Sequence, residues 1–303
     1  MESNNAPSQP VADTAIAPKK IGKMKGGYLV VVESFRMLGK NKSIMMFPLL
    51  SIFFELLAAA IFIAGYFFVY GFSENFFNKA GDPNAPAIVY ACLFVFYITS
   101  VFIASFFQAG LAAVVSSQIN DKKLSFNDGV NVAASHAGKI LLWSFVAATV
   151  GVVLQMIANK NKVIGRVVAN VFGFAWDIVT FFIVPILVLE NETFIGSLKR
   201  SGEIFKNKWG QTLVANFSTG LFFGVIVISA VSIFLASLFF GQPRVEVLML
   251  MIILLGVFIA FILVLSATIE GIYRVILYEY AAHDKLPGSF TKELIVGAIK
   301  EKK

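Results

Sequence analysis

Two acidic residues inside long apolar runs are the first candidates for chemistry in this sequence. Glu55 and Asp177 fall near the middle of segments long enough to cross a membrane, and no lysine or arginine lies at the same depth to neutralise them. A charged acid at mid-membrane costs several kcal/mol, so such residues usually face the protein interior and often have a function. Two hypotheses follow: a proton- or cation-responsive pair that lines a path, or two protonated acids that each hydrogen-bond a neighbouring helix.

Two further pairs of residues have helical spacing. Glu270 and Arg274 are four residues apart, which favours an ion pair that anchors a helix end; a lipid-headgroup site is the alternative. Gly220 and Gly224 form a GxxxG pattern, which allows close helix approach and indicates packing within a helix bundle.

Motifs for catalysis and cofactor binding are absent from the sequence. No phosphate-binding loop or dinucleotide-binding glycine pattern occurs, and His136 and His283 lack the spacing of metal ligands. We therefore expect no metal and no cofactor. An enzyme would need titratable groups that converge near one interface, for example Glu270 with His136 or His283.

The composition determines the class of protein that must position these residues. Hydrophobic residues make up 58% of the chain and charged residues 14%, with 32 phenylalanines. Soluble domains are roughly 45–50% apolar and about 25% charged. The sequence therefore predicts an all-α, polytopic transmembrane helical bundle.

Six apolar runs are long enough to cross a bilayer, because about 20 helical residues span its hydrocarbon. They cover approximately residues 47–69, 87–114, 140–158, 167–189, 212–240 and 247–269, and the last helix is expected to continue to Tyr280. Amphipathic helices in the membrane interface are predicted before spans 1, 3 and 5, at residues 28–41, 126–137 and 192–207. Ser125 and Asp128 have capping-box spacing at the start of the second. This repeated order leaves a threefold internal repeat open.

The regions that flank the spans define the expected domain limits. Residues 1–25 are rich in small and polar residues and are predicted to form a disordered cytoplasmic tail. The six-span membrane domain then covers residues 26–282, and a cytoplasmic tail covers residues 283–303.

The distribution of lysine and arginine predicts the orientation. With both termini inside, 20 of the 25 basic residues lie on the cytoplasmic side, as the positive-inside rule requires. The loop at 159–166 opposes this bias, and a four-span topology is the alternative. The net charge of +7 is scattered over loops without a nucleic-acid-binding motif, so anionic lipid is the expected partner. The candidate headgroup contacts are Arg36, Lys40, Lys42, Lys139, Lys199, Arg200, Lys206 and Lys208.

Three stretches together resemble an uncharacterised family of prokaryotic multi-span membrane proteins, a domain of unknown function. They are SFRMLGKNKSIMMFPLLS (34–51), FFIVPILVLENETFIGSLKRSGEIFKNKWGQTL (181–213) and LYEYAAHDKLPGSF (277–290). Glu279 stands where a basic residue is expected in that family. The resemblance implies a topology and a bacterial or archaeal inner membrane, but no chemistry.

The expected function is that of a non-enzymatic membrane protein, either a permease-like subunit or a scaffold, that contacts inner-leaflet lipids and other membrane proteins. An intramembrane or lipid-modifying enzyme is the alternative. The oligomeric state stays open.

Overall fold

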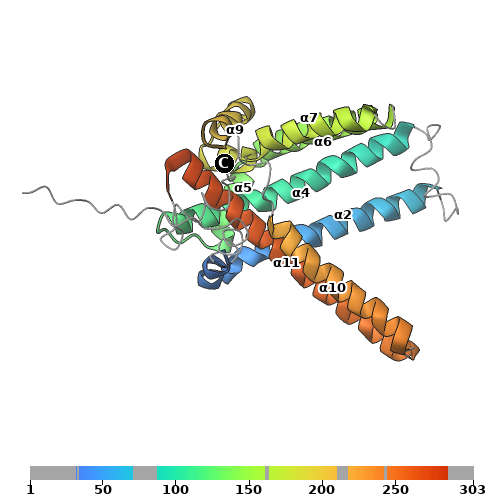
Figure 1. The fold of residues 1–303 in the computed structure, drawn as a ribbon. Coiled ribbons are helices and arrows are strands. Elements are labelled where there is room, and N and C mark those ends of the chain that lie inside the picture. Colours follow the sequence, from blue (N-terminus) through green and yellow to red (C-terminus); the bar gives the residue numbers. More distant parts are fainter. Residues whose placement is uncertain are drawn as a thin grey trace, which may run out of the picture.

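The computed structural model describes Val32 and residues 34–70, 87–160, 164–209, 218–241 and 244–285. These residues are almost entirely helical, and no strand occurs among them (Figure 1). The predicted tail at 1–25 lies outside the described residues, as does 286–303. The prediction of an all-α helical bundle is confirmed.

Residues 34–40 are helical, and the other described helices follow them along the chain. In chain order these are η1 (Lys42–Met45), α2 (Met46–Tyr70), α4 (Ala87–Ile119), α5 (Phe126–Ser135), α6 (Ala137–Lys160), α7 (Ile164–Thr180), α8 (Ile183–Leu189), α9 (Phe194–Trp209), α10 (Ser218–Gly241) and α11 (Val245–His283). Six segments are long and apolar enough to cross a membrane: α2 with η1, α4, α6, α7 with α8, α10, and α11. The six predicted spans are therefore confirmed.

A short helix precedes each of the three hairpins, as the sequence predicts. Residues 34–40 come before α2 and α4, α5 comes before α6 and α7, and α9 comes before α10 and α11. The start of α5 has the expected capping box, in which the Ser125 hydroxyl accepts from Asp128 N–H while the Asp128 carboxylate accepts from Ser125 N–H. This exchange satisfies two amide donors that a helix start otherwise leaves unpaired.

The fourth span is broken, although the sequence prediction treats 167–189 as one helix. Pro185 lacks the N–H that would bond to the Phe181 carbonyl in a continuous helix, and the chain turns at residues 181–182 between α7 and α8. The Phe182 N–H instead donates to the Ser201 hydroxyl of α9 over 3.2 Å. Proline and a side chain from α9 thus create a separate, buried helix α8.

The helix α11 has 39 residues and serves two roles. Its length of about 58 Å, at 1.5 Å per residue, is far more than the hydrocarbon thickness of about 30 Å. The first part pairs with α10 and exposes many apolar side chains, whereas most of residues 268–281 are buried. The α10–α11 hairpin diverges from α2, as Figure 1 shows.

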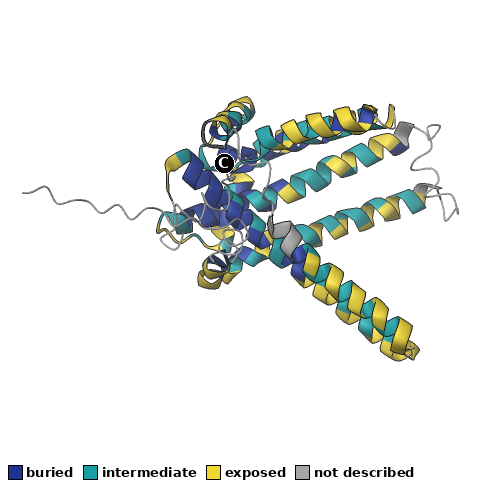
Figure 2. Cartoon of the chain, viewed as in Figure 1, coloured by how far each residue is buried: buried dark blue, intermediate teal, exposed yellow. Residues whose placement is uncertain are grey.

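The protein core lies at one end of the bundle. Figure 2 shows the buried residues gathered where η1, α5, α8, α9 and residues 268–281 of α11 meet. We call this the core end. Phe47, Phe182 and Tyr278 are fully buried there. The apolar faces of α5 and α9 pack on this core through Ala133 and Ile204, so protein contacts, and not the membrane alone, hold these amphipathic helices.

Candidate functional site

The two intramembrane acids lie on helices that are not neighbours. Glu55 is on α2, close to the Ser100 side chain of α4. Asp177 is exposed on α7. Helix α2 packs on α4, α4 packs on α6, and α6 packs on α7, so two helices separate the acids (Figure 1). The structure does not bring this sequence-predicted pair together.

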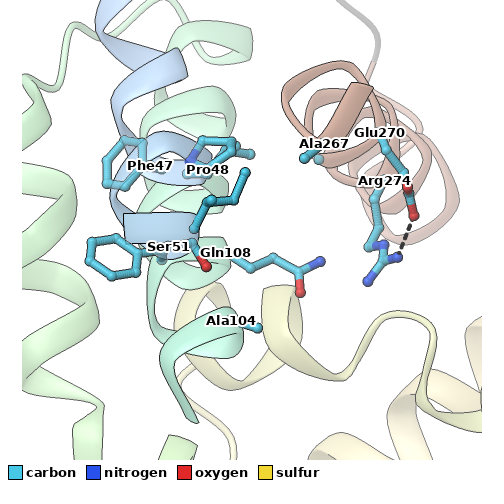
Figure 3. A pocket seen from close by; sticks show the side chains of 12 residues that line it. Phe47, Pro48, Ser51, Ala104, Gln108, Ala267, Glu270 and Arg274 are labelled. Atoms are coloured by element: carbon cyan, nitrogen blue, oxygen red, sulfur yellow. Dashed lines mark hydrogen bonds and ion pairs between the residues drawn. The ribbon is translucent and has the colours of Figure 1, made fainter. Parts of the chain in front are cut away.

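The Glu270–Arg274 ion pair forms as the spacing predicts, over 3.0 Å. The Arg274 guanidinium also lies over the Phe181 ring, with 5.1 Å between Cζ and the ring centroid. Both charged residues line a cavity of about 230 Å³ between α2, α4 and α11 (Figure 3). We call it the lateral cavity.

The predicted headgroup contacts fall into three groups. Lys139 donates to Asn191 O over 2.9 Å and to Asn191 Oδ1 over 2.7 Å, and Arg200 pairs with Glu190 over 3.2 Å, so protein groups hold both. The Lys208 side chain lies outside the described residues. Five predicted contacts are exposed: Arg36, Lys40, Lys42, Lys199 and Lys206.

A second cavity, of about 530 Å³, opens at the core end where residues 34–41 approach the loop after α4. We call it the basic pocket. Lys40, Lys122 and Lys123 line it together with a single acid, Asp121. Of these lysines only Lys40 was a sequence candidate. Lys122 and Lys123 could have been recognised in the sequence as two adjacent lysines directly after a span.

A tight helix end positions the two adjacent lysines. Asp121 adopts a left-handed conformation with φ 55°, and Lys122 N–H donates to Ser117 O over 2.8 Å. This six-to-one bond is the Schellman arrangement that closes a helix C-terminus. It positions Lys122 and Lys123, which line the pocket together with Gln118.

Sequence reasoning gave no role to a buried polar cluster around Glu279. This acid is 3% exposed. It accepts a hydrogen bond from Ser116 Oγ at Oε1, and its Oε2 lies 3.2 Å from His283 Nδ1. A nucleophile needs its base within hydrogen-bond reach, but here the acid lies between the serine and the histidine. The cluster ties α4 to α11, and its order differs from a Ser–His–acid triad, in which the histidine lies between the serine and the acid.

The structure does not pair Glu270 with His136 or His283 among the described residues. Glu270 pairs with Arg274, and His283 contacts Glu279. His136 Nε2 lies 3.3 Å from Asn191 Oδ1. Among the described residues, no group of three or more metal-ligating side chains gathers.

The second glycine of the GxxxG pattern in α10 occupies an open position. A Cβ added at Gly224 would meet nothing within 4 Å, and the surroundings of Gly220 lie outside the described residues. Other glycines are tightly packed: a Cβ at Gly129 of α5, for example, would lie 2.9 Å from the Gly110 carbonyl oxygen of α4 and 2.7 Å from the Phe47 ring.

The fold and these cavities define a multi-pass α-helical membrane protein. Residues 87–288 match the family of unknown function DUF6159, and the chain belongs to this family. The match covers about two thirds of the chain and leaves out the stretch 34–51. No curated protein and no solved structure matches.

Proposed function

We propose that this protein is a non-enzymatic scaffold of a prokaryotic inner membrane, whose core end faces the cytoplasm and binds anionic phospholipid of the inner leaflet. The basic pocket is the observation that carries the proposal. Its three lysines and one aspartate give it a net charge of +2. Lysines clustered beside a membrane surface attract anionic headgroups, with about 1 kcal/mol for each charge.

The distribution of charge over the described residues supports the orientation. The core end carries Lys40, Lys42, Lys122, Lys123 and Lys139, among others, whereas the opposite ends of α6, α7 and α11 carry Lys160, Arg166 and Arg244. Lysine and arginine accumulate on the cytoplasmic side of membrane proteins.

The separation of Glu55 from Asp177 favours a scaffold over a permease-like subunit. A transport path through the bundle would need polar groups that share one passage, and these acids lie on the non-adjacent helices α2 and α7. The α10–α11 hairpin, in contrast, presents apolar side chains such as Ile228, Leu235 and Leu250, which suit contacts with lipid and with other membrane proteins.

The test is a binding titration on the full chain in detergent micelles. Short-chain phosphatidylglycerol is added, and bound lipid is counted by native mass spectrometry, with phosphatidylcholine as the neutral comparison. The triple variant Lys40→Gln, Lys122→Gln, Lys123→Gln is expected to bind phosphatidylglycerol at least about tenfold more weakly, because three charges of about 1 kcal/mol are removed.

The control variant removes three charges at the opposite end, by Lys160→Gln, Arg166→Gln and Arg244→Gln. It should retain wild-type affinity. Equal losses in both triple variants would contradict a site in the basic pocket. Inorganic phosphate forms a further arm: if it displaces the phospholipid completely at equal concentration, the ligand is a soluble anion and the lipid proposal is wrong.

A further inference from the structure

Two polar groups that line the lateral cavity have no hydrogen-bond partner in the described part of the chain. The Gln108 amide points from α4 across the cavity toward α11 (Figure 3), and it has no hydrogen bond among the described residues. On the far wall, Arg274 Nε is buried without a hydrogen-bond partner. Unpaired polar groups beside hydrocarbon are costly, so this cavity is suited to a ligand that carries its own polar atoms.

The cavity lies at the depth of the lipid headgroups. Arg244 marks one membrane face at the start of α11. The helix rises about 39 Å from there to Glu270, at 1.5 Å per residue, which exceeds the hydrocarbon thickness of about 30 Å even with a moderate tilt. Glu270 and Arg274 therefore lie at the opposite headgroup level, beside the start of α2.

The charges in the cavity balance each other. Glu270 and Arg274 contribute one negative and one positive charge, and their side chains stay 41% and 25% exposed while paired. Only Nη2 of Arg274 bonds to Glu270, through Oε1, so the partly exposed guanidinium keeps further N–H groups for an anion, and Glu270 keeps Oε2 for a cation. This arrangement differs from the basic pocket, where positive charge prevails.

We propose that the lateral cavity binds a phospholipid with a zwitterionic headgroup that carries a primary ammonium group. Its phosphate accepts from the Arg274 guanidinium and the Gln108 amide, and its ammonium group donates to Glu270. The Phe181 ring under the guanidinium keeps Arg274 in place. The apolar wall formed by Pro48, Ile52, Phe107 and Leu111 accommodates the first part of an acyl chain.

Binding is measured on the full chain in nanodiscs that hold a trace of spin-labelled phosphatidylethanolamine, phosphatidylcholine or phosphatidylglycerol. The immobilised fraction in the electron paramagnetic resonance spectrum reports protein-bound lipid. We expect phosphatidylethanolamine to be enriched at least about threefold over phosphatidylcholine in the wild type, and over both other lipids in the triple lysine variant, which lacks the charge of the basic pocket. Phosphatidylcholine lacks an N–H donor for Glu270, and the phosphatidylglycerol headgroup lacks a cation. Equal enrichment of all three lipids in the triple lysine variant would overturn the proposal.

Two variants locate the site. Ala267→Trp places a large side chain at the exposed rim of the cavity and should abolish the enrichment. Ala260→Trp, on an exposed part of α11 outside the cavity, should leave it unchanged. Glu270→Gln should remove the preference for phosphatidylethanolamine over phosphatidylcholine. Persistence of the enrichment in Ala267→Trp would show that the lipid binds elsewhere.

This site is independent of the proposed anionic-lipid function. The triple lysine variant of the basic pocket should keep the phosphatidylethanolamine enrichment, and Ala267→Trp should keep phosphatidylglycerol binding. Retained phosphatidylglycerol binding also shows that Ala267→Trp is folded. The two proposed lipid sites can therefore be tested separately.

Discussion

The Tyr278 hydroxyl donates a hydrogen bond to Glu190 Oε1 over 2.8 Å, across 88 residues of sequence. Glu190 ends α8, and its Oε2 pairs with Arg200 of α9. One carboxylate thus connects α8, α9 and α11. Because hydrogen bonds to charged groups are stronger than neutral ones, we expect this junction to contribute strongly to the stability of the core end.

Tyr278→Phe should lower the free energy of unfolding by about 1–3 kcal/mol, because a charge-assisted hydrogen bond is lost in a buried region. The measurement is thermal unfolding of the full chain in detergent micelles. Tyr97→Phe is the control, since the exposed Tyr97 hydroxyl makes no hydrogen bond among the described residues. Similar midpoints for both variants would refute the role assigned to the junction.

Gly129→Val should destabilise the contact between α4 and α5. Even a Cβ at this position would lie 2.7 Å from the Val114 side chain and 2.9 Å from the Gly110 carbonyl oxygen. A backbone oxygen cannot move aside as a flexible side chain can, so the cost should reach about 1–3 kcal/mol. In contrast, Gly224→Ala meets open space and should raise stability slightly, by up to about 1 kcal/mol, through helix propensity. Reversed signs in thermal unfolding would contradict the packing described.

Ser201→Ala should leave the Phe182 N–H without its partner at the break between α7 and α8. A buried donor left unsatisfied costs about 1–3 kcal/mol. The comparison is Ser237→Ala on α10, where the hydroxyl bonds only to a carbonyl of its own helix. Amide hydrogen exchange should accelerate around residues 181–189 in the first variant alone. Unchanged exchange there would mean that the break does not depend on α9.

The start of α5 should lose protection in acid. Hydrogen bonds from the Ser125 side chain and backbone hold the pKa of Asp128 below its ordinary value. Because the pKa of Asp128 is lower in the folded state, its ionised carboxylate stabilises the cap at pH values above the unfolded pKa of about 3.9. This stabilisation is lost as the pH falls through the lower folded-state pKa. Hydrogen exchange of the first amides of α5 should therefore rise, relative to the intrinsic rate, below about pH 4.

Asp128→Asn removes this titrating carboxylate, so the pH dependence of exchange in α5 should flatten. Asp121→Asn, in the preceding turn, should retain the wild-type dependence. If Asp128→Asn keeps the full acid sensitivity, another group controls the start of this helix.

Much of the fold follows from local sequence. The six spans are visible because each run is apolar over a membrane thickness, and the α5 capping box is visible because Ser125 and Asp128 are three residues apart. The break before α8 was missed, although Pro185 signalled it, because a partner for the Phe182 N–H comes from Ser201 on another helix.

The candidate sites were harder to predict because each joins distant segments. Glu279 is held by Ser116, 163 residues away, and Lys40 meets Lys122 only when the chain after α4 returns to the first helix. In the lateral cavity, helical spacing predicted the Glu270–Arg274 pair, but Gln108 reaches it from α4. Periodicity describes one helix face and cannot assign its neighbour.

The side of the membrane that the core end faces can be measured directly by cysteine labelling. Single cysteines are introduced into a Cys92→Ser background at Lys123 and His283 of the core end, and at Lys160 and Arg244 of the opposite end. A membrane-impermeant maleimide should label Lys160→Cys and Arg244→Cys in intact cells, and should label Lys123→Cys and His283→Cys only after permeabilisation. Labelling of Lys123→Cys in intact cells, or protection of Lys160→Cys, would contradict a cytoplasmic core end.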